Sequence, residues 1–488
     1  MRLGGLDIGT TGCKLSVYDQ DGSFVFNSYQ EYEVSRHGGE HEIDAKVIFD
    51  AVCTVIKNTT KETTVDAIGV TTFGETFTIL DENDNVLMPS MLYTDPRGEK
   101  ECEEICEKLS KEHLTRVMGI KPHQMFSLSK MMWIKKNCPE IWAKTKRVLL
   151  MEDYIIYMLS GNAYLDYALA TRSNAFDVRN KCWSQEILDA AGIDKGLLSK
   201  LVPSGTLAGN IRPNLAKELG LSEDTKIVVG AHDQVAAAVG AGVFEVGQAT
   251  DGTGTVECIT PVYDKLPENE AFFEAGYGIV PYVFDGTYVS YAFSYTGGAA
   301  IKWCKDKLAP EISYKDLDMS VKDEPTGILV LPHFAGAATP YMDMGSKAAM
   351  LGITLETTKE DIYKAIMEGV TYEIMMNIEN VERCGIKPQK LFATGGGASS
   401  EVWLQIKADI LNRPITALDA KEAGACGTCM LVGVAIGLYK DLYEAKKYFV
   451  REKKTFTPNP EKAKAYAKLM NAYRSVYKNI RPIIKETN

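Results

Sequence analysis

The sequence lacks any hydrophobic run long enough to cross a lipid bilayer. Its longest apolar stretches, such as residues 430–438, fall far short of the ~20 residues that a membrane-spanning helix needs. The residues that follow Met1 contain no apolar signal-peptide core and no cleavage site. We therefore expect no membrane partner and a cytoplasmic location.

Basic residues are too few for a protein that binds the backbone of a nucleic acid. The 488-residue chain has 54 lysines and arginines against 65 aspartates and glutamates, a formal net charge of -11. A nucleic-acid-binding surface normally carries a basic patch, so nucleic acid is not an expected partner. A nucleotide is still compatible with this charge, because backbone amides and a metal ion can hold phosphates locally.

The sequence also lacks the paired cysteine spacing of a disulfide framework. Its 11 cysteines are odd in number and scattered between Cys13 and Cys429. Cys426 and Cys429 have the spacing of a redox motif, but no second Cys/His pair follows to complete a metal site. Because these two lie in an Ala/Gly-rich helical stretch, we interpret them as core residues.

Two common nucleotide-binding motifs are missing, the Gly-Lys pair of a P-loop and the G-x-G-x-x-G fingerprint. The chain instead has glycine-rich turns at residues 7–12, 250–255 and 393–400. Glycines allow phosphates to approach the backbone closely, while Asp7 and Lys14 add a carboxylate for hydrated Mg²⁺ and a cation. Taken alone, the first turn could be an ordinary hairpin turn. The second turn favours the phosphate interpretation, because two such turns could clamp a triphosphate.

The length of the chain predicts two substantial domains, since a single hydrophobic core stops growing well below 488 residues. Short apolar strands alternate with helical patterns, which predicts an α/β fold, and residues 100–201 are expected to be mostly helical. The second glycine turn repeats the Asp, Gly and Thr content of the first, which suggests a duplicated domain. We place the boundary near Gly247, which gives domains of residues 1–246 and 247–488.

Two long gapped patterns carry a resemblance to a known family. Residues 125–137, MFSLSKMMWIKKN, fit the first signature of the FGGY carbohydrate kinases, and residues 348–368 contain the second with its expected gap. The sequence resembles this family over essentially its whole length. The resemblance implies two actin-like, ribonuclease H-like ATPase domains with the active site in a cleft between them. It also implies a carbohydrate kinase that moves the γ-phosphate of ATP, with Mg²⁺, to a sugar or polyol hydroxyl.

The same resemblance implies roles for individual residues. Asp233 takes the position of the general base, and Asp7 that of the residue that supports Mg²⁺. The implied nucleotide contacts are Thr10, Thr11, Lys14, Thr253, Gly254, Gly297, Gly298, Gly396, Gly397 and Glu401. The implied acceptor contacts are Gly74, Glu75, Thr76, Tyr93, Asp95, His232 and Gln234.

Several of these residues also have a purely structural interpretation. Asp233 directly follows an apolar strand and begins a helix, so it could be the helix N-cap, for which aspartate is favoured. Asp95 could form a local ion pair with Arg97 beside a proline turn. His232 could contact the substrate or simply pack against a loop.

The acceptor is the least defined part of the prediction. Gly74-Glu75 stands where xylulose kinases usually show Met-His and glycerol kinases show Arg-Glu, so the chain matches neither pattern. We expect a small neutral sugar or polyol, a ketopentose such as xylulose, with glycerol or another short polyol as the alternative. An actin-like ATPase without a sugar acceptor is the alternative of another class, against which Asp233 and Glu75 argue. Many members of the family form dimers, so a homodimer is an allowed partner for which the sequence carries no signal of its own.

Overall fold

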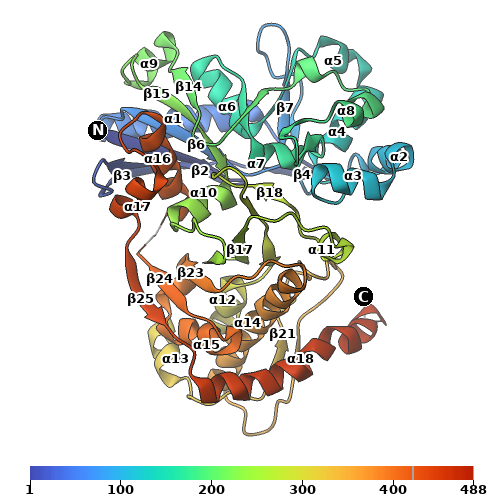
Figure 1. The fold of residues 1–488 in the computed structure, drawn as a ribbon, viewed down its shortest axis with the longest axis vertical. Helices are drawn as coiled ribbons and strands as arrows, with labels where there is room; N and C mark the ends of the chain where they lie inside the picture. The colour runs from blue at the N-terminus through green and yellow to red at the C-terminus, as the bar shows by residue number, and fades with distance from the viewer. Residues whose placement is uncertain (420–421, 487–488) are drawn as a thin grey trace. The chain divides into compact units, whose positions relative to one another are not determined.

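The computed structural model describes residues 1–419 and 422–486. The chain divides into two compact units, whose elements are labelled in Figure 1. The first unit comprises Met1–Gly242, Ile279–Gly286 and Glu422–Val450, and the second comprises Val243–Gly278, Thr287–Lys421 and Arg451–Asn488. Each unit is therefore built from three segments, whereas the sequence analysis divides the chain once. Within the described residues, no helix has both the length and the apolar character to cross a bilayer.

A six-stranded mixed sheet lies at the centre of the first unit, with the strand order β14-β15-β6-β1-β2-β3. Its strands are β1 (Arg2–Ile8), β2 (Gly12–Asp19), β3 (Phe24–Glu31), β6 (Ala67–Thr72), β14 (Leu207–Asn210) and β15 (Lys226–His232). β1, β6 and β15 are parallel to one another, and the other three strands pair antiparallel. β6 is buried throughout and β15 almost throughout, as expected for parallel strands that are covered on both faces.

Four helices cover this sheet: α1 (Ala45–Glu62), α6 (Met151–Ser160), α10 (Asp233–Gly240) and α16 (Ala423–Ala435). Asp44 caps α1 by accepting from the Lys46 amide, and the apolar face of α1 packs into one core with Leu6 and Ile8 of β1. Alternation along the strand then directs Gly5 to the opposite face, where α16 lies.

Glycines allow α16 to pack backbone against backbone. A Cβ added to Gly5 would lie 2.4 Å from the Ala425 carbonyl oxygen, and one added to Gly427 would lie 1.9 Å from that of Ala236 on α10. Figure 1 shows α16, late in the chain, beside the blue N-terminal strands. This close packing explains why Glu422–Val450 belongs to the first unit.

The interpretation of the cysteines as core residues holds for part of them: five are buried, five are partly buried and Cys182 is exposed. All eleven are free, and both Cys426 and Cys429 are buried in α16. Burial raises the pKa of the Cys426 thiol to about 12. A buried thiol of this kind is protonated at neutral pH and is not a reactive thiolate.

The remaining elements of the first unit are short. The helices are α2 (Glu99–Leu109), α3 (Lys111–Met118), α4 (Ser127–Asn137), α5 (Pro139–Lys144), α7 (Tyr167–Ala170), α8 (Gln185–Ala191), α9 (Pro213–Leu219), α17 (Leu442–Phe449), η1 (Thr171–Ser173) and η2 (Lys195–Leu197). The strands are β4 (Ser35–His37), β5 (Glu40–Ile43), β7 (Phe77–Leu80), β8 (Ser90–Met91), β9 (Arg147–Leu150), β10 (Tyr164–Asp166), β11 (Phe176–Asp177), β12 (Cys182–Trp183), β13 (Lys200–Val202) and β18 (Val280–Pro281). Residues 100–201 are mostly helical, as the sequence predicts, with short strands between the helices.

The second unit repeats the strand pattern of the first. Its sheet contains the strands β19 (Tyr288–Val289), β17 (Glu257–Tyr263), β16 (Gln248–Thr253), β23 (Lys390–Thr394), β24 (Ile415–Leu418) and β25 (Glu452–Phe456) in that order, and β20 (Ala292–Ser294) also pairs with β17. β16, β23 and β24 are parallel, and the flanking strands pair antiparallel. From β3 to β14, the sheet of the first unit shows the same order of antiparallel and parallel pairings. The strand pairing therefore confirms the predicted duplication.

The other elements of the second unit are the strands β21 (Leu329–Leu331) and β22 (Ala349–Leu351) and the helices α11 (Glu270–Glu274), α12 (Gly298–Leu308), α13 (Tyr314–Ser320), α14 (Lys359–Arg383), η3 (Gly396–Ser399), α15 (Glu401–Leu411) and α18 (Pro460–Glu486). α14 begins with a capping box, in which the Thr358 hydroxyl accepts from the Asp361 amide and the Asp361 carboxylate accepts from the Thr358 amide. This reciprocal capping starts a helix of 25 residues, fifteen of which are buried.

Carboxyl groups buried at the start of α6 predict an unusual pH dependence of stability. Burial and the nearby Asp166 carboxylate raise the pKa of Glu152 well above its ordinary value, and burial raises that of Asp153 to about 8. The folded state therefore keeps protons that the unfolded chain loses, so the free energy of unfolding should fall as the pH rises from about 4 to about 8. Glu152→Gln keeps the shape of the side chain and removes its titration. It should flatten this slope by up to about 1.4 kcal/mol per pH unit.

Urea unfolding between pH 5 and pH 8 measures this slope. Glu103→Gln is the matched control, because Glu103 is exposed on α2, and it should leave the slope unchanged. Parallel slopes for the wild type and Glu152→Gln would show that Glu152 is ionised in the folded state.

Candidate active site

An ion pair fills the region in which the sequence predicts acceptor contacts. Glu75 follows the end of β6 and has φ 66°, a left-handed conformation that is rare for residues other than glycine. Ser127 donates a 2.5 Å hydrogen bond to the Glu75 carbonyl oxygen and so fixes this conformation. The Arg172 Nε donates to Glu75 Oε1 at 2.6 Å, and a second guanidinium N–H donates to the same oxygen. Both side chains are almost buried, with 12 % and 8 % exposed.

Asp233 lies beside this pair as the first residue of α10. The N-cap of α10 is His232, without a side-chain capping bond, so the structure does not show the capping role that the sequence left open for Asp233. Asp233 Oδ1 instead accepts from the amide of Gln234 at 2.6 Å. The Asp233 side chain is 38 % exposed. Burial of its carboxyl group nevertheless raises the pKa of Asp233 to about 6, while the Gln234 amide and Arg172 oppose this rise.

His232 connects the ion pair to Asp233. Its Nδ1 lies 3.3 Å from Asp233 Oδ1. Burial and the Arg172 guanidinium lower the pKa of His232 to about 3, so the ring is neutral and the contact is not an ion pair. A Cβ added to Gly74 would lie within about 3.3 Å of both Arg172 and His232, which explains the glycine there. The structure thus brings together Gly74, Glu75, His232, Asp233 and Arg172, the last of which the sequence analysis missed.

Asp95 forms the local ion pair that the sequence analysis gave as an alternative. Its carboxylate accepts from the side chain of Arg97 at 2.8 and 2.7 Å and from the His41 amide at 2.8 Å. No part of this side chain is exposed. Tyr93, by contrast, is 44 % exposed. The Thr76 hydroxyl is buried and has no hydrogen-bond partner among residues 1–419 and 422–486.

The first glycine turn contributes carboxylates and a cation. Asp7 on β1 lies opposite Lys14 on β2, and the Lys14 Nζ donates to Glu422 Oε1 at 2.8 Å. Burial, then the carboxylates of Asp233 and Glu422, raise the pKa of Asp7 to about 7 against the opposing effect of Lys14. Thr10 is half-buried and Thr11 is exposed in the turn. Glu422 is a further member of this group that the sequence analysis missed.

The second glycine turn packs against the start of α12. The amide of Gly298 donates to the Gly254 carbonyl at 2.8 Å, and that of Gly297 donates to the Thr255 carbonyl at 2.9 Å. A Cβ on Gly298 would lie 2.5 Å from the Gly254 oxygen, so these glycines are required by close packing. The structure therefore brings two predicted nucleotide-binding segments together at the N-terminus of a helix, where partial positive charge accumulates.

The third glycine turn packs on Thr253. A Cβ on Gly395, which has φ 81°, would lie 2.5 Å from the Thr253 carbonyl oxygen, and one on Gly397 would lie 2.4 Å from its Cγ2. A Cβ on Gly396 would meet no described atom within 4 Å. The first and third glycines thus have a structural role, and only the backbone of Gly396 is left open for a ligand to approach. Glu401, just beyond this turn, is exposed and pairs with Lys454 at 2.5 Å.

A buried lysine lies beneath these turns and was also missed from the sequence. Lys407 of α15 donates to Asp251 Oδ2 at 2.8 Å and to Thr253 Oγ1 at 2.6 Å, and its Nζ lies 2.8 Å from Glu257 Oε1. The three charged side chains are at most 1 % exposed. Lys407 therefore links α15, which follows the third turn, to the second turn.

Models of one protein family match both halves of the sequence. The N-terminal domain of the FGGY family of carbohydrate kinases matches residues 2–240, and the C-terminal domain matches residues 252–436. This chain belongs to the FGGY family of carbohydrate kinases. It is therefore a phosphotransferase, and the predicted family, two-domain actin-like fold and enzyme class are confirmed.

Relatives of this carbohydrate kinase are named for different substrates. A xylulose kinase of Lactococcus lactis is 27 % identical over 97 % of this chain and 96 % of its own. A gluconokinase of Bacillus subtilis is 28 % identical over 96 % of this chain and 93 % of its own. The crystal structure of a ligand-bound xylulose kinase from Lactobacillus acidophilus shares the fold, with a TM-score of 0.90 at 24 % identity over the full length of both chains. These similar identities do not distinguish a neutral from an acidic sugar.

Kinases of this family use ATP, generally with Mg²⁺, and the residues around Asp7 fit that ion. The Asp7 carboxyl has a raised pKa because it is buried and two other carboxylates lie near it, and a divalent cation would relieve that repulsion. Mg²⁺ keeps several of its waters and is usually bound through one or two carboxylates and the phosphates of the substrate. Asp7 therefore fits the predicted role in this kinase.

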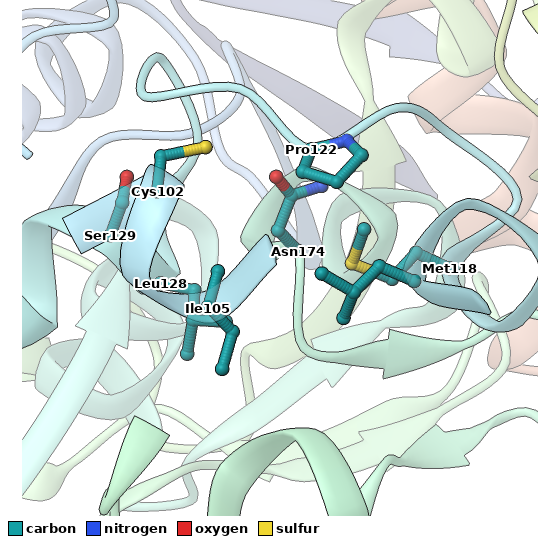
Figure 2. Close-up of a pocket in the computed structure, with 8 residues that line it drawn as sticks. Cys102, Ile105, Met118, Pro122, Leu128, Ser129 and Asn174 are labelled. Atoms are coloured by element: carbon teal, nitrogen blue, oxygen red, sulfur yellow. The ribbon is translucent and has the colours of Figure 1, made fainter. Parts of the chain in front are cut away.

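A small cavity of the kinase lies among helices α2, α3 and α4 and the segment that ends at Asn174 (Figure 2). Its volume of ≈ 10 Å³ has room for about one water molecule. The Asn174 Nδ2 is buried and has no hydrogen-bond partner among the described residues, so such a water would satisfy it. The apolar lining includes Ile105 and Leu128, which does not suit a sugar.

The glycines of the third turn give a prediction for the kinase. Gly396→Ala should change the free energy of unfolding by less than about 0.5 kcal/mol, because the new methyl group meets no described atom within 4 Å. If the predicted nucleotide contact is right, the same methyl group should raise the KM for ATP at least about tenfold. Gly397→Ala should instead destabilise the protein by about 1–3 kcal/mol through overlap with Thr253. Thermal unfolding and ATP titration separate the two effects. An unchanged KM in Gly396→Ala would remove this turn from the nucleotide site.

Proposed function

We propose that this kinase transfers the γ-phosphoryl group of Mg-ATP to a hydroxyl of a small neutral sugar, a ketopentose such as xylulose. The observation that carries the proposal is the cluster of Asp233, Glu75, Arg172 and His232 at the carboxyl ends of two parallel strands, where ligands of α/β folds usually bind. The xylulose kinase relative that matches 97 % of the chain supports the choice of a ketopentose.

Asp233 is the general base of the proposed reaction. Its carboxylate accepts the proton of the acceptor hydroxyl as the oxygen of that hydroxyl forms a bond to the γ-phosphorus. The bond between this phosphorus and the bridging oxygen breaks, and ADP leaves with the electron pair. Because the transition state of phosphoryl transfer is loose, most of the acceleration comes from positioning and charge stabilisation, and the proton moves late.

The predicted residues of the first two glycine turns hold the phosphates of ATP in this proposal. Thr10, Thr11 and Lys14 on one turn and Thr253 on another would donate to phosphate oxygens. Gly254, whose amide donates to the Val256 carbonyl oxygen, would let a phosphate approach the backbone closely. When bound at Asp7, Mg²⁺ would supply positive charge for the phosphates. We include a cytoplasmic location in the proposal, because a sugar kinase needs the ATP of that compartment. A homodimer stays a prediction for which light scattering is the test.

A screen of ATP consumption tests the proposal. The purified protein is mixed with Mg-ATP and one acceptor at a time from pentuloses, hexuloses, deoxyketoses, tetritols, glycerol and aldonates. We expect the highest kcat/KM with a pentulose. A higher value for glycerol or a tetritol would replace the ketopentose by a short polyol. No transfer to any acceptor, with ATP hydrolysis retained, would instead support the actin-like ATPase.

A further inference from the structure

Arg172 and Glu75 form an ion pair, and no predicted role accounts for its arginine. Arg172 lies in η1, and two of its guanidinium N–H groups end on one oxygen of Glu75. The guanidinium carbon also lies 4.9 Å from the centre of the Phe126 ring, over its face. A guanidinium that is both paired and stacked is held in one orientation.

Backbone strain accompanies the placement of this pair. Glu75 has φ 66°, which is unfavourable for a residue with a Cβ. Ser127 of α4 holds the strained peptide in place through the Glu75 carbonyl oxygen. Strain of this kind persists only where the surrounding structure fixes the residue, and it is common at binding and active sites.

The four side chains of Glu75, Arg172, His232 and Asp233 together carry an excess of negative charge. Glu75 and Arg172 cancel, His232 is neutral, and the Asp233 carboxylate adds one negative charge once it has lost its proton. Lys130 is a further cation that interacts electrostatically with Glu75, but its Nζ donates to the Asp95 carbonyl oxygen at 2.7 Å. The carboxylates of Glu75 and Asp233 would therefore repel an acceptor that carries a carboxylate. The nearest guanidinium, that of Arg172, is already paired with Glu75.

We propose that the Glu75–Arg172 pair determines acceptor specificity by admitting neutral sugars and rejecting sugar acids. This inference rests on the proposed function and deepens it. To bind a carboxylate, Arg172 would have to leave Glu75 as an unpaired charge in a nearly buried position, which is strongly unfavourable. Like charges placed together are a standard means of excluding a wrong ligand. Arg172 is thus a specificity residue that acts through Glu75.

Removing the charge of Glu75 tests the inference. Glu75→Gln leaves the Arg172 guanidinium without its anion, so D-gluconate should become a better acceptor relative to D-xylulose. The double variant Glu75→Gln/Arg172→Gln lacks the same carboxylate and has no guanidinium to offer. The readout is the ratio of kcat/KM for D-xylulose to that for D-gluconate, which cancels any general loss of folded enzyme. Glu101→Gln, a buried glutamate on α2 that pairs with Lys136 at 3.6 Å, is the matched control.

We expect the wild type and Glu101→Gln to share a ratio well above one. The ratio of Glu75→Gln should be at least about tenfold lower than that of the double variant, the size expected for a hydrogen-bonded charge. Equal ratios for these two variants would overturn the inference and leave the proposed function intact. A wild type that transfers phosphate to no sugar would instead overturn the proposed function.

A measurement on the wild type keeps the inference testable if the variants do not fold. D-glucitol and D-gluconate have the same carbon chain and differ in charge at one end. D-glucitol should inhibit the phosphorylation of D-xylulose at least about tenfold more strongly than D-gluconate does, because only the acid meets the repulsion. Stronger inhibition by D-gluconate would contradict the inference directly.

Discussion

Replacing Asp233 with asparagine should lower kcat by about 10²–10⁴, the usual contribution of a general base. Asparagine has the shape of aspartate but cannot accept the proton of the acceptor hydroxyl at neutral pH. Because the asparagine Oδ1 can still accept the hydrogen bond from the Gln234 amide, the substitution should leave thermal unfolding and the KM for ATP nearly unchanged. A coupled assay of ADP release with D-xylulose measures kcat.

The pH profile gives a second test of Asp233. Its pKa is raised to about 6, and only the ionised form can act as a base. The kcat/KM of the wild type should therefore fall as the pH drops below about 6 and be level above about 7. Asp50→Asn, which removes an exposed aspartate from α1, is the matched control and should retain the wild-type rate. Wild-type kcat in Asp233→Asn would remove the proposed base.

Replacing Lys407 with methionine should destabilise the protein by about 3–5 kcal/mol. The substitution removes the cation from between Asp251 and Glu257, both fully buried, and breaking a buried ion pair leaves charge without compensation. The loss should be larger at pH 8 than at pH 5, because burial raises the pKa of Glu257 and its carboxyl group can take up a proton at the lower pH. Urea unfolding at both pH values measures it.

A compensating change separates charge from packing in this cluster. Lys407→Met/Glu257→Gln removes one carboxylate together with the lysine, so it should recover a large part of the lost stability. A loss below about 1 kcal/mol in Lys407→Met alone would show that the cluster is not held by charge. Equal losses in the single and double variants would place the effect in packing.

Local signals in the sequence predicted much of the fold and of the candidate site. The glycine turns are short in sequence, and their Asp, Gly and Thr content indicated the duplication that the strand pairing confirms. Asp233 was predicted from the resemblance to the family's catalytic segment, and its place at the end of a strand and the start of a helix agrees with that prediction. The division of the chain was not predicted in full, because α16 joins the first unit through glycine contacts with α10 that leave no local pattern.

Arg172, Glu422 and Lys407 were missed because tertiary packing brings them to the predicted residues from distant segments. Glu422 lies 408 positions from its partner Lys14, and Arg172 lies 97 positions from Glu75. Lys407 did carry a signal, since it follows Trp403 by one helical turn and so belongs to the apolar face of α15. A lysine in that position needs a buried partner, and the acidic residues of the second turn provide it.

The most direct test of the account is the product of the reaction with D-xylulose. Mass spectrometry of a mixture of the protein, Mg-ATP and D-xylulose should detect ADP and a pentulose monophosphate in equal amounts. The same mixture with Asp233→Asn should contain the phosphosugar at a level lower by about 10²–10⁴ at equal times. ADP and inorganic phosphate without any phosphosugar would contradict the account, because the protein would then hydrolyse ATP without a sugar acceptor.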